Sequence, residues 1–287
     1  MSAFEKTAQK KRWPLSRLRD PSFWRSLPSF DMTPSHASER LSYKGEEFHD
    51  AGFALWPKCI EHAKVHEALA EIDKVKAAGL PAIFALTSGK FEAIFQSPLL
   101  RQNIAGLLGK EVVQLPGIWV HDIGAKQRGW EAHVDEEGRV DLKSPDKITV
   151  WIKLSGGVHD APMTIVHARS SQGVSENFQS LSELPFAQTL ELLHDAHCVP
   201  AHVGDAIAWS PHLVHFGGRA QKRRVALSLE FARKESVSFA KVVPQRQLTF
   251  DEQLFLIGHN LCAYGRDEKR EPLAATFSEI GERLRDG

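Results

Sequence analysis

The stretches 130-WEAHVDEEG-138 and 204-GDAIAWSPHLVHFGGRAQKRRVALSLEF-231 decide the expected fold. The first places His133 and Asp135 two residues apart, and the second places His215 after an apolar segment. Side chains at i and i+2 of an extended backbone point to the same side, so we expect the imidazole and the carboxylate to be presented together. Two imidazoles and one carboxylate with open positions opposite them are typical of a non-haem Fe(II) site.

An arginine that could bind a carboxylate follows the second histidine in the sequence. Nine residues after His215, Arg224 opens a strand-like segment, and a fixed guanidinium beside a metal site is suited to a bidentate grip on a carboxylate. His212 competes for the histidine position and Arg223 for the arginine position. His212 does not have the spacing from the preceding turn glycine, Gly204, that His215 has. Because Arg223 and Arg224 alternate along a strand, only one of them can face the interior.

The middle of the chain has the sequence pattern of a β protein. Short β-branched and aromatic segments are separated there by Gly, Pro, Asp and Ser turns, which predicts a sandwich or a barrel. We expect strands at 111–122, 147–154, 162–167, 198–203, 205–210 and 223–232.

Helical periodicity is found on both sides of this β-rich part. Residues 58–78 have apolar residues at helical spacing, residues 97–108 begin with Ser97 as an N-cap candidate, and 249–286 have helical composition. We therefore expect one structural unit over 1–287. Its parts are an arm at 1–45, a helical segment at 46–109, a core at 110–235 with an insertion at 174–197, and a helical tail at 236–287.

Composition limits the partners and the compartment. Lys+Arg and Asp+Glu are both 36, so the neutral chain does not look like a nucleic-acid-binding protein. We expect no membrane span, because no apolar run is long enough, and the basic N-terminus lacks the apolar region of a secretory signal. The cysteines Cys59, Cys198 and Cys262 are far apart, which favours thiols in a reducing cytoplasm. Oligomeric state is not indicated.

The ordered set of motifs resembles the Fe(II)/2-oxoglutarate-dependent dioxygenases, most of all the phytanoyl-CoA hydroxylase-like branch. His-x-Asp is followed by 148-ITVWIKLS-155, then by 161-APMTIVHARSSQG-173, and last by a Gly-Asp-apolar stretch in which His215 falls 11 residues after Gly204. The resemblance covers roughly residues 110–232. The chain departs from the branch where Ala precedes Pro in the middle segment, where Gln172 replaces a usual histidine, and in a shorter His-to-Arg gap.

This resemblance implies a mainly β fold with flanking helices around a double-stranded β-helix, or jelly-roll, core. It implies Fe(II) held by His133, Asp135 and His215, and 2-oxoglutarate as co-substrate with its far carboxylate on Arg224. With O2, the implied reaction is oxidative decarboxylation to succinate and CO2, coupled to hydroxylation of a substrate C–H bond. Related halogenases have a small residue at the carboxylate position, so Asp135 favours hydroxylation or desaturation over halogenation.

The substrate stays open at this point. A small molecule, a protein side chain, and a non-catalytic cupin-like barrel that only binds a ligand are the three hypotheses. We expect the N-terminal helices and the 174–197 insertion to close over the substrate and exclude water. Gln114, Trp119, His121 and Trp130 could line the site, and Trp151 and Lys153 share one face of their strand. For all six we favour aromatic core for the Trp residues and exposed or barrel-end polar groups for the others.

Overall fold

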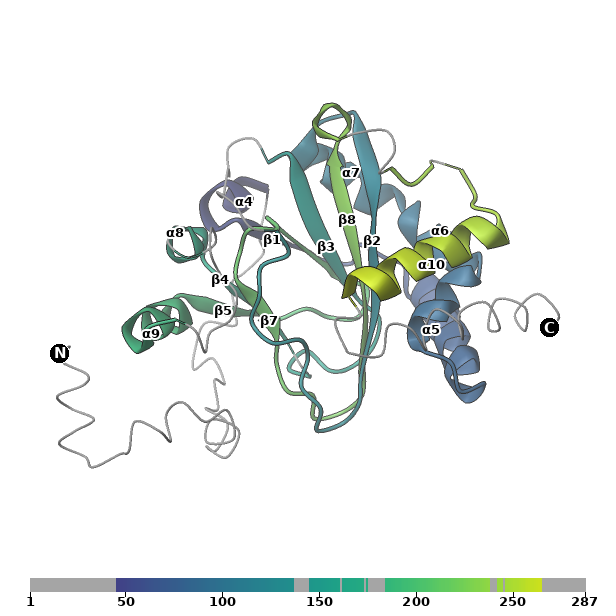
Figure 1. The fold of residues 1–287 in the computed structure, drawn as a ribbon, viewed down its shortest axis with the longest axis horizontal. Helices are drawn as coiled ribbons and strands as arrows, with labels where there is room; N and C mark the ends of the chain where they lie inside the picture. The colour runs from purple at the N-terminus through teal and green to yellow at the C-terminus, as the bar shows by residue number, and fades with distance from the viewer. Residues whose placement is uncertain are drawn as a thin grey trace.

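The computed structural model describes residues 45–136, 145–160, 162–172, 174, 184–237, 242–244 and 246–264 (Figure 1). The expected arm up to residue 44, part of the 174–197 insertion, and the tail beyond residue 264 lie outside the described residues. None of the helices within these ranges is long and apolar enough to cross a bilayer.

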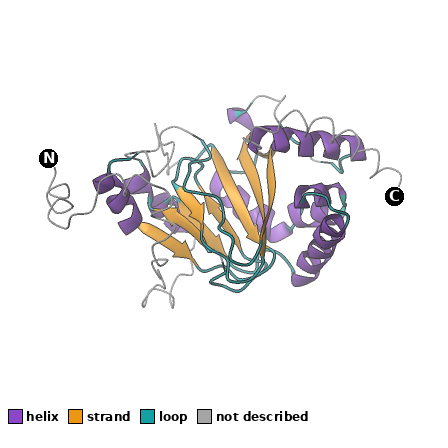
Figure 2. Ribbon diagram, turned by 60° about the horizontal axis from the view of Figure 1, so that its bottom comes forward, coloured by secondary structure: helices purple, strands orange, loops and turns teal. Residues whose placement is uncertain are grey.

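Two antiparallel sheets form the centre of the molecule, with helices on either side (Figure 2). The larger sheet has the order β1-β6-β3-β8-β2 and consists of β1 (Phe53–Trp56), β2 (Val112–Ile123), β3 (Lys147–Lys153), β6 (Ala206–Trp209) and β8 (Arg224–Arg233). The smaller sheet has the order β5-β4-β7 and consists of β4 (Met163–Val166), β5 (Ala196–Val199) and β7 (His215–Gly217). The expectation of a mainly β core with flanking helices is confirmed.

One predicted strand boundary is wrong, and His215 lies in a different sheet from the strand predicted before it. The strand expected at 198–203 is β5, which ends at Val199, because Asp205 accepts the backbone N–H of His202 (2.7 Å) and holds a turn there. His215 does not end the strand that starts near residue 205. A turn in which the Leu213 amide donates to the Ser210 carbonyl (3.0 Å) intervenes, and His215 begins β7 in the other sheet.

One face of the larger sheet is aliphatic, and helices cover it. Alternate residues of the strands point to this outer face, since side chains alternate across a strand. They are Ile118, Val120, Ile148, Val150, Ile152, Val225, Leu227, Leu229 and Phe231. Against them pack α5 (His62–Ala77), η1 (Ala82–Thr87), α6 (Lys90–Phe95), α7 (Pro98–Leu108) and α10 (Phe250–Tyr264), the group around the sheet on the right of Figure 1.

This packing corrects the expected role of the N-terminal helices. Helices α5, α6 and α7 cover the outer face, whereas the intervening residues Thr149 and Trp151 point to the inner face. The helices therefore do not close over the inner face. Helices α8 (Ala168–Ser171) and α9 (Phe186–His194) lie beside the smaller sheet, whereas α4 (Gly45–Ala51) packs on β1 at the edge of the larger sheet and on α8 (Figure 1). A short 3-10 helix, η2 (Lys234–Ser236), follows β8.

The two long predicted helices are present with small changes. The helix predicted at 58–78 begins only at His62. Ser97 precedes α7 as predicted, but its hydroxyl donates to the Cys59 carbonyl (3.0 Å) and makes no cap with the helix.

Strand β2 contains an irregularity that α10 fixes. Its pairing with β8 shifts between Gln114 and Ile118. The buried Asn260 accepts the Ile118 amide at 2.8 Å, and its own Nδ2 donates to the Pro116 carbonyl at 2.8 Å. These bonds hold the bulge in place and set which side of β2 Gly117 faces.

Candidate metal centre

Three side chains predicted from the sequence converge on the inner side of the larger sheet. One ligand atom each of His133, Asp135 and His215 lie within 4.8 Å of one another. Asp135 Oδ1 is 3.7 Å from His133 Nε2 and 3.4 Å from His215 Nε2. The segment carrying His133 pairs with β7, where the His133 and His215 amides donate to each other's carbonyls (3.1 and 2.9 Å). The competitor His212 lies outside this cluster, and its Nδ1 contacts the Glu136 carbonyl (2.9 Å).

Hydrogen bonds orient both imidazoles toward the centre of the cluster. His133 Nδ1 is 2.7 Å from the Glu131 carbonyl oxygen, and His215 Nδ1 is 2.9 Å from that of Leu213. A carbonyl only accepts, so each Nδ1 carries the proton and donates. In the neutral form of each ring, Nε2 therefore keeps a lone pair directed at its neighbours, which is the tautomer that a metal-binding histidine requires. Burial acts to lower the pKa of His215, but Asp135 outweighs it and raises this pKa, so without a metal the ring also takes a proton at Nε2.

The carboxylate is oriented in the same way. Thr149 Oγ1 donates to Asp135 Oδ2 at 2.6 Å, and Trp209 Nε1 donates to the same oxygen at 3.2 Å, so Oδ1 stays directed at the imidazoles. Burial acts to raise the pKa of Asp135, but the charge of His215 and the hydrogen bonds outweigh it and hold this pKa below its ordinary value. The donor set is thus two imidazole nitrogens and one ionised oxygen, which fits Fe(II).

A buried arginine lines the same cavity. Arg224 is 1% exposed, and its Nε and Nη1 have no hydrogen-bond partner among the described residues. Its guanidinium lies 5.2 Å from the Trp151 ring centroid, and burial lowers its pKa to about 10. Buried donors without partners are costly, so this site has unused capacity for an acceptor such as a carboxylate.

Small residues keep the space beside the guanidinium open. Gly129 and Gly217 approach each other closely: a Cβ on either would lie 2.7 or 2.8 Å from the Cα of the other, and 3.2 or 3.4 Å from Arg224 Nη2. Arg223 points the other way, where its guanidinium pairs with Asp122 (2.8 Å) and Asp73 (2.6 Å) on the surface. As expected from strand alternation, Arg223 and Arg224 point to opposite sides at the start of β8.

These groups line one cavity that opens to solvent. Besides the cluster and Arg224, its lining includes Gly117, Trp119, His121, Trp130, Thr149, Trp151, Met163, Trp209, Gly217, Ser228 and Glu230. Interpreting Trp119 and Trp130 only as core, and His121 as an outlying polar group, is therefore wrong. Burial and the charge of Arg224 lower the pKa of His121 to about 3, so its ring, 3.1 Å from Ser228 Oγ, is neutral.

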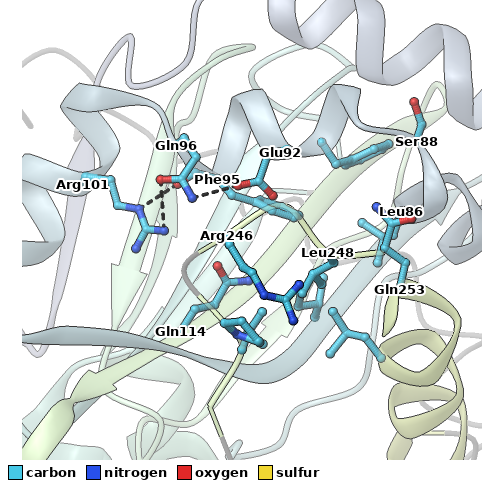
Figure 3. A pocket seen from close by; sticks show the side chains of 15 residues that line it. Leu86, Ser88, Glu92, Phe95, Gln96, Arg101, Gln114, Arg246, Leu248 and Gln253 are labelled. Atoms are coloured by element: carbon cyan, nitrogen blue, oxygen red, sulfur yellow. Dashed lines mark hydrogen bonds between the residues drawn. The ribbon is translucent and has the colours of Figure 1, made fainter. Parts of the chain in front are cut away.

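Two further polar residues are buried rather than exposed. Lys153 is 1% exposed and donates to the Gly157 carbonyl, and burial lowers its pKa to about 8. Gln114 lines a different pocket, on the helix-covered face of the sheet (Figure 3). The described lining of that pocket contains no histidine. We therefore place the chemistry in the cavity of His133 and His215.

Comparison with known proteins gives matches among structures alone. No family model matches the chain, and no curated protein sequence matches it. Several solved structures share its fold. The nickel complex of the non-haem monooxygenase ThoJ is 17% identical, with 79% of this chain and 98% of ThoJ covered and a TM-score of 0.55.

Two enzymes from nogalamycin biosynthesis are similar as well. The non-haem α-ketoglutarate-dependent epimerase SnoN is 16% identical, with 71% and 90% of the chains covered and a TM-score of 0.50. The carbocyclase SnoK of the same class is 12% identical, with 70% and 92% covered and a TM-score of 0.52. At these identities the similarity establishes the fold, and the chain therefore has the fold of non-haem 2-oxoglutarate-dependent enzymes.

Proposed function

We propose that this chain is an Fe(II)- and 2-oxoglutarate-dependent oxygenase that oxidises a small molecule. The observation that carries the proposal is the convergence of His133, Asp135 and His215 in one cavity with Arg224, whose buried donors lack partners among the described residues. The fold shared with ThoJ, SnoN and SnoK supports it.

Each of these residues has a distinct task. His133 Nε2, His215 Nε2 and Asp135 Oδ1 would hold Fe(II) in the cavity. Bound Fe(II) supplies the activation of O2 that decarboxylates 2-oxoglutarate to succinate and CO2. Arg224 binds the far carboxylate of 2-oxoglutarate and so fixes the direction in which the keto acid points.

The surrounding residues maintain that arrangement. Thr149 and Trp209 occupy Asp135 Oδ2, which reserves Oδ1 for the metal. The Trp151 ring lies against the Arg224 guanidinium and keeps water from it, which strengthens the charge–charge contact with a dicarboxylate.

We propose hydroxylation as the outcome. The Asp135 carboxylate fills the position that a halogenase leaves to chloride, which supports hydroxylation or the related desaturation. The named activities of ThoJ, SnoN and SnoK differ, so the fold alone does not select among oxidative outcomes.

The finer classification rests on the ordered motifs. They support the phytanoyl-CoA hydroxylase-like branch, with the two sheets as the halves of a jelly-roll and residues 1–287 as a single oxygenase domain. A cavity walled by both sheets favours a small molecule over a protein side chain, which needs a groove. The complete donor set argues against a purely binding barrel.

The test is succinate formation from 2-oxoglutarate with Fe(II) and O2, without added substrate. We expect slow turnover that is lost in His133→Ala and Asp135→Ala and retained in the surface variant Arg223→Gln. Metal binding by the wild-type chain without any succinate would reject the oxygenase and favour the binding barrel.

A further inference from the structure

A carboxylate lies in the cavity at the end opposite to Arg224. Glu230 and Arg224 are on the same strand, β8, and both line the cavity. Their separation of six residues corresponds to about 20 Å along a strand. Across the sheet, Glu230 is paired with Thr149, the residue that donates to Asp135. Glu230 is therefore near the metal cluster, on the side away from the guanidinium.

The chain makes room for this carboxylate. A Cβ added to Gly117 would lie 2.3 Å from Glu230 Cδ and 2.4 Å from its Oε1. A Cβ at this position would displace the carboxylate from its place over β2, and Asn260 fixes the bulge that places the glycine there.

The local charge is negative. Lys147 Nζ is 3.1 Å from Glu230 Oε2 and 3.3 Å from Glu136 Oε2. Burial acts to lower the pKa of Lys147, but the two carboxylates outweigh it, so the ammonium stays charged. Among the described residues, this ammonium is shared between two carboxylates, which leaves the group negative when these three are counted. The Glu230 side chain is 15% exposed, so solvent screens its charge only in part.

Aromatic faces adjoin the carboxylate. Trp119 on β2 is paired with Ser228, two residues from Glu230 on the same face of β8, and its ring centroid is 5.8 Å from that of Trp130. Both indoles line the cavity. A carboxylate beside indole rings provides an ion pair and cation–π contacts, which together are suited to an organic ammonium.

We propose that the substrate carries a protonated amine, which Glu230 binds beside Trp119 while the carbon to be oxidised lies between Glu230 and Asp135. This inference rests on the proposed function and adds the substrate class to it. The two ends of the cavity then have opposite preferences: Arg224 takes the dicarboxylate, and Glu230 takes the cation.

The test uses three probes of similar size on the full chain loaded with Ni(II) and 2-oxoglutarate: phenethylammonium, 2-phenylethanol and 3-phenylpropionate. Calorimetric titration should show the ammonium binding about tenfold tighter than the alcohol, and the carboxylate weakest. In Glu230→Gln, which keeps the shape of the side chain, the ammonium and the alcohol should bind alike. Glu111→Gln, which removes the carboxylate of the surface pair with Lys234 (3.2 Å), is the matched control and should keep the preference.

Two further variants keep the test decisive if Glu230→Gln does not fold. Lys147→Met removes the competing cation and should increase the preference for ammonium, a gain that a merely structural role of Glu230 would not produce. Gly117→Ala displaces the carboxylate without removing it and should weaken the preference.

Equal binding of the ammonium and the alcohol by the wild-type chain, or a preference that survives Glu230→Gln, overturns the inference. Succinate formation by the wild-type chain without a probe is measured in parallel and reports on the oxygenase itself. Turnover without an ammonium preference removes the inference alone. An ammonium preference without turnover removes the proposed function and leaves Glu230 as an amine-binding group.

Discussion

His133 and His215 hold each other in place through their backbones. The amide of each donates to the carbonyl of the other, and their ring centroids are 4.3 Å apart. The two imidazoles are 82 residues apart in the chain, yet they are set as a pair before any metal arrives. Pre-organisation of this kind lowers the conformational cost of metal binding.

Replacing either histidine should remove metal binding and spare the fold. In His215→Ala the backbone bonds to His133 remain, so the chain should keep its secondary structure. We expect Ni(II) or Fe(II) affinity to fall at least about 100-fold, because a ligand is lost and not merely reoriented. Calorimetric metal titration measures the affinity, and circular dichroism checks the fold. His212→Ala is the control, and a loss of affinity there as large as in His215→Ala would argue for a different ligand.

Thr149 should matter for metal affinity although it is no ligand in the proposal. Thr149→Val keeps the shape of the side chain but removes the donor to Asp135 Oδ2, leaving Trp209 to orient the carboxylate. Affinity should fall about 10- to 100-fold, the usual effect of losing such a supporting hydrogen bond. Thr164→Val, on β4 against Cys198 (3.4 Å), is the matched control. An unchanged affinity would mean that Trp209 alone is sufficient.

Arg224→Met should stabilise the unloaded chain and abolish its response to 2-oxoglutarate. The wild-type guanidinium is buried, and two of its donors lack partners among the described residues, so replacing it should raise the free energy of unfolding by about 1 kcal/mol or more. Metal-loaded wild type should gain about 2.7 kcal/mol from 2-oxoglutarate at 100 times its Kd, and the variant should gain nothing. Urea unfolding with and without the ligand measures both. Arg223→Met should still respond to 2-oxoglutarate, and a response in Arg224→Met would place the anchor elsewhere.

Asn260→Ala should destabilise the fold by about 2–3 kcal/mol, because it leaves the buried Ile118 amide and the Pro116 carbonyl without their partner. Denaturant unfolding measures this change. Asn103→Ala is a fitting control. Among the described residues, the Asn103 side chain makes one weak hydrogen bond, to Cys59 Sγ at 4.0 Å. A loss no greater than in that control would show that the bulge is stable without α10.

Alkaline pH should destabilise the chain through Cys59. Burial raises the pKa of this thiol from 9.0 to about 12, whereas in the unfolded chain it ionises near its ordinary value. A pKa raised in the folded state gives stability that is complete below pH 9 and is lost as pH rises from about 9 toward 12. Between pH 8 and 11, wild type should therefore lose more stability than Cys59→Ala in matched unfolding titrations. Parallel curves would mean that the thiolate is accommodated in the folded state.

Local patterns were enough to predict much of the site. The His-x-Asp spacing together with the ordered motifs around it singled out the three side chains that meet, His133, Asp135 and His215. Strand alternation predicted that only one of Arg223 and Arg224 faces the interior. The same rule contained a signal that went unused. Thr149 is two residues before Trp151 on a predicted strand, so the two side chains must lie on the same face of that strand. A hydroxyl on that face can donate to a nearby carboxylate, as Thr149 does to Asp135.

Other features depend on contacts that no local pattern encodes. The apolar stripe of residues 58–78 predicts a buried helix face, but both faces of the larger sheet carry apolar residues, such as Val150 and Ile207. Periodicity therefore does not tell which face the helix covers. Gly117 has no exceptional local sequence, and its role becomes visible only when Glu230, 113 residues away, is seen above it.

Strand β8 carries two unlike rows of side chains. Val225, Leu227 and Leu229 face the helices, while Arg224 and Glu230 face the cavity. Inserting or deleting a single residue in the turn ahead of this strand would exchange the rows, sending the charged groups into the aliphatic layer and filling the cavity with methyl groups. A change in the length of that turn would thus damage both folding and ligand binding. A point substitution in the apolar row would mainly affect folding, and one in the charged row would mainly affect ligand binding.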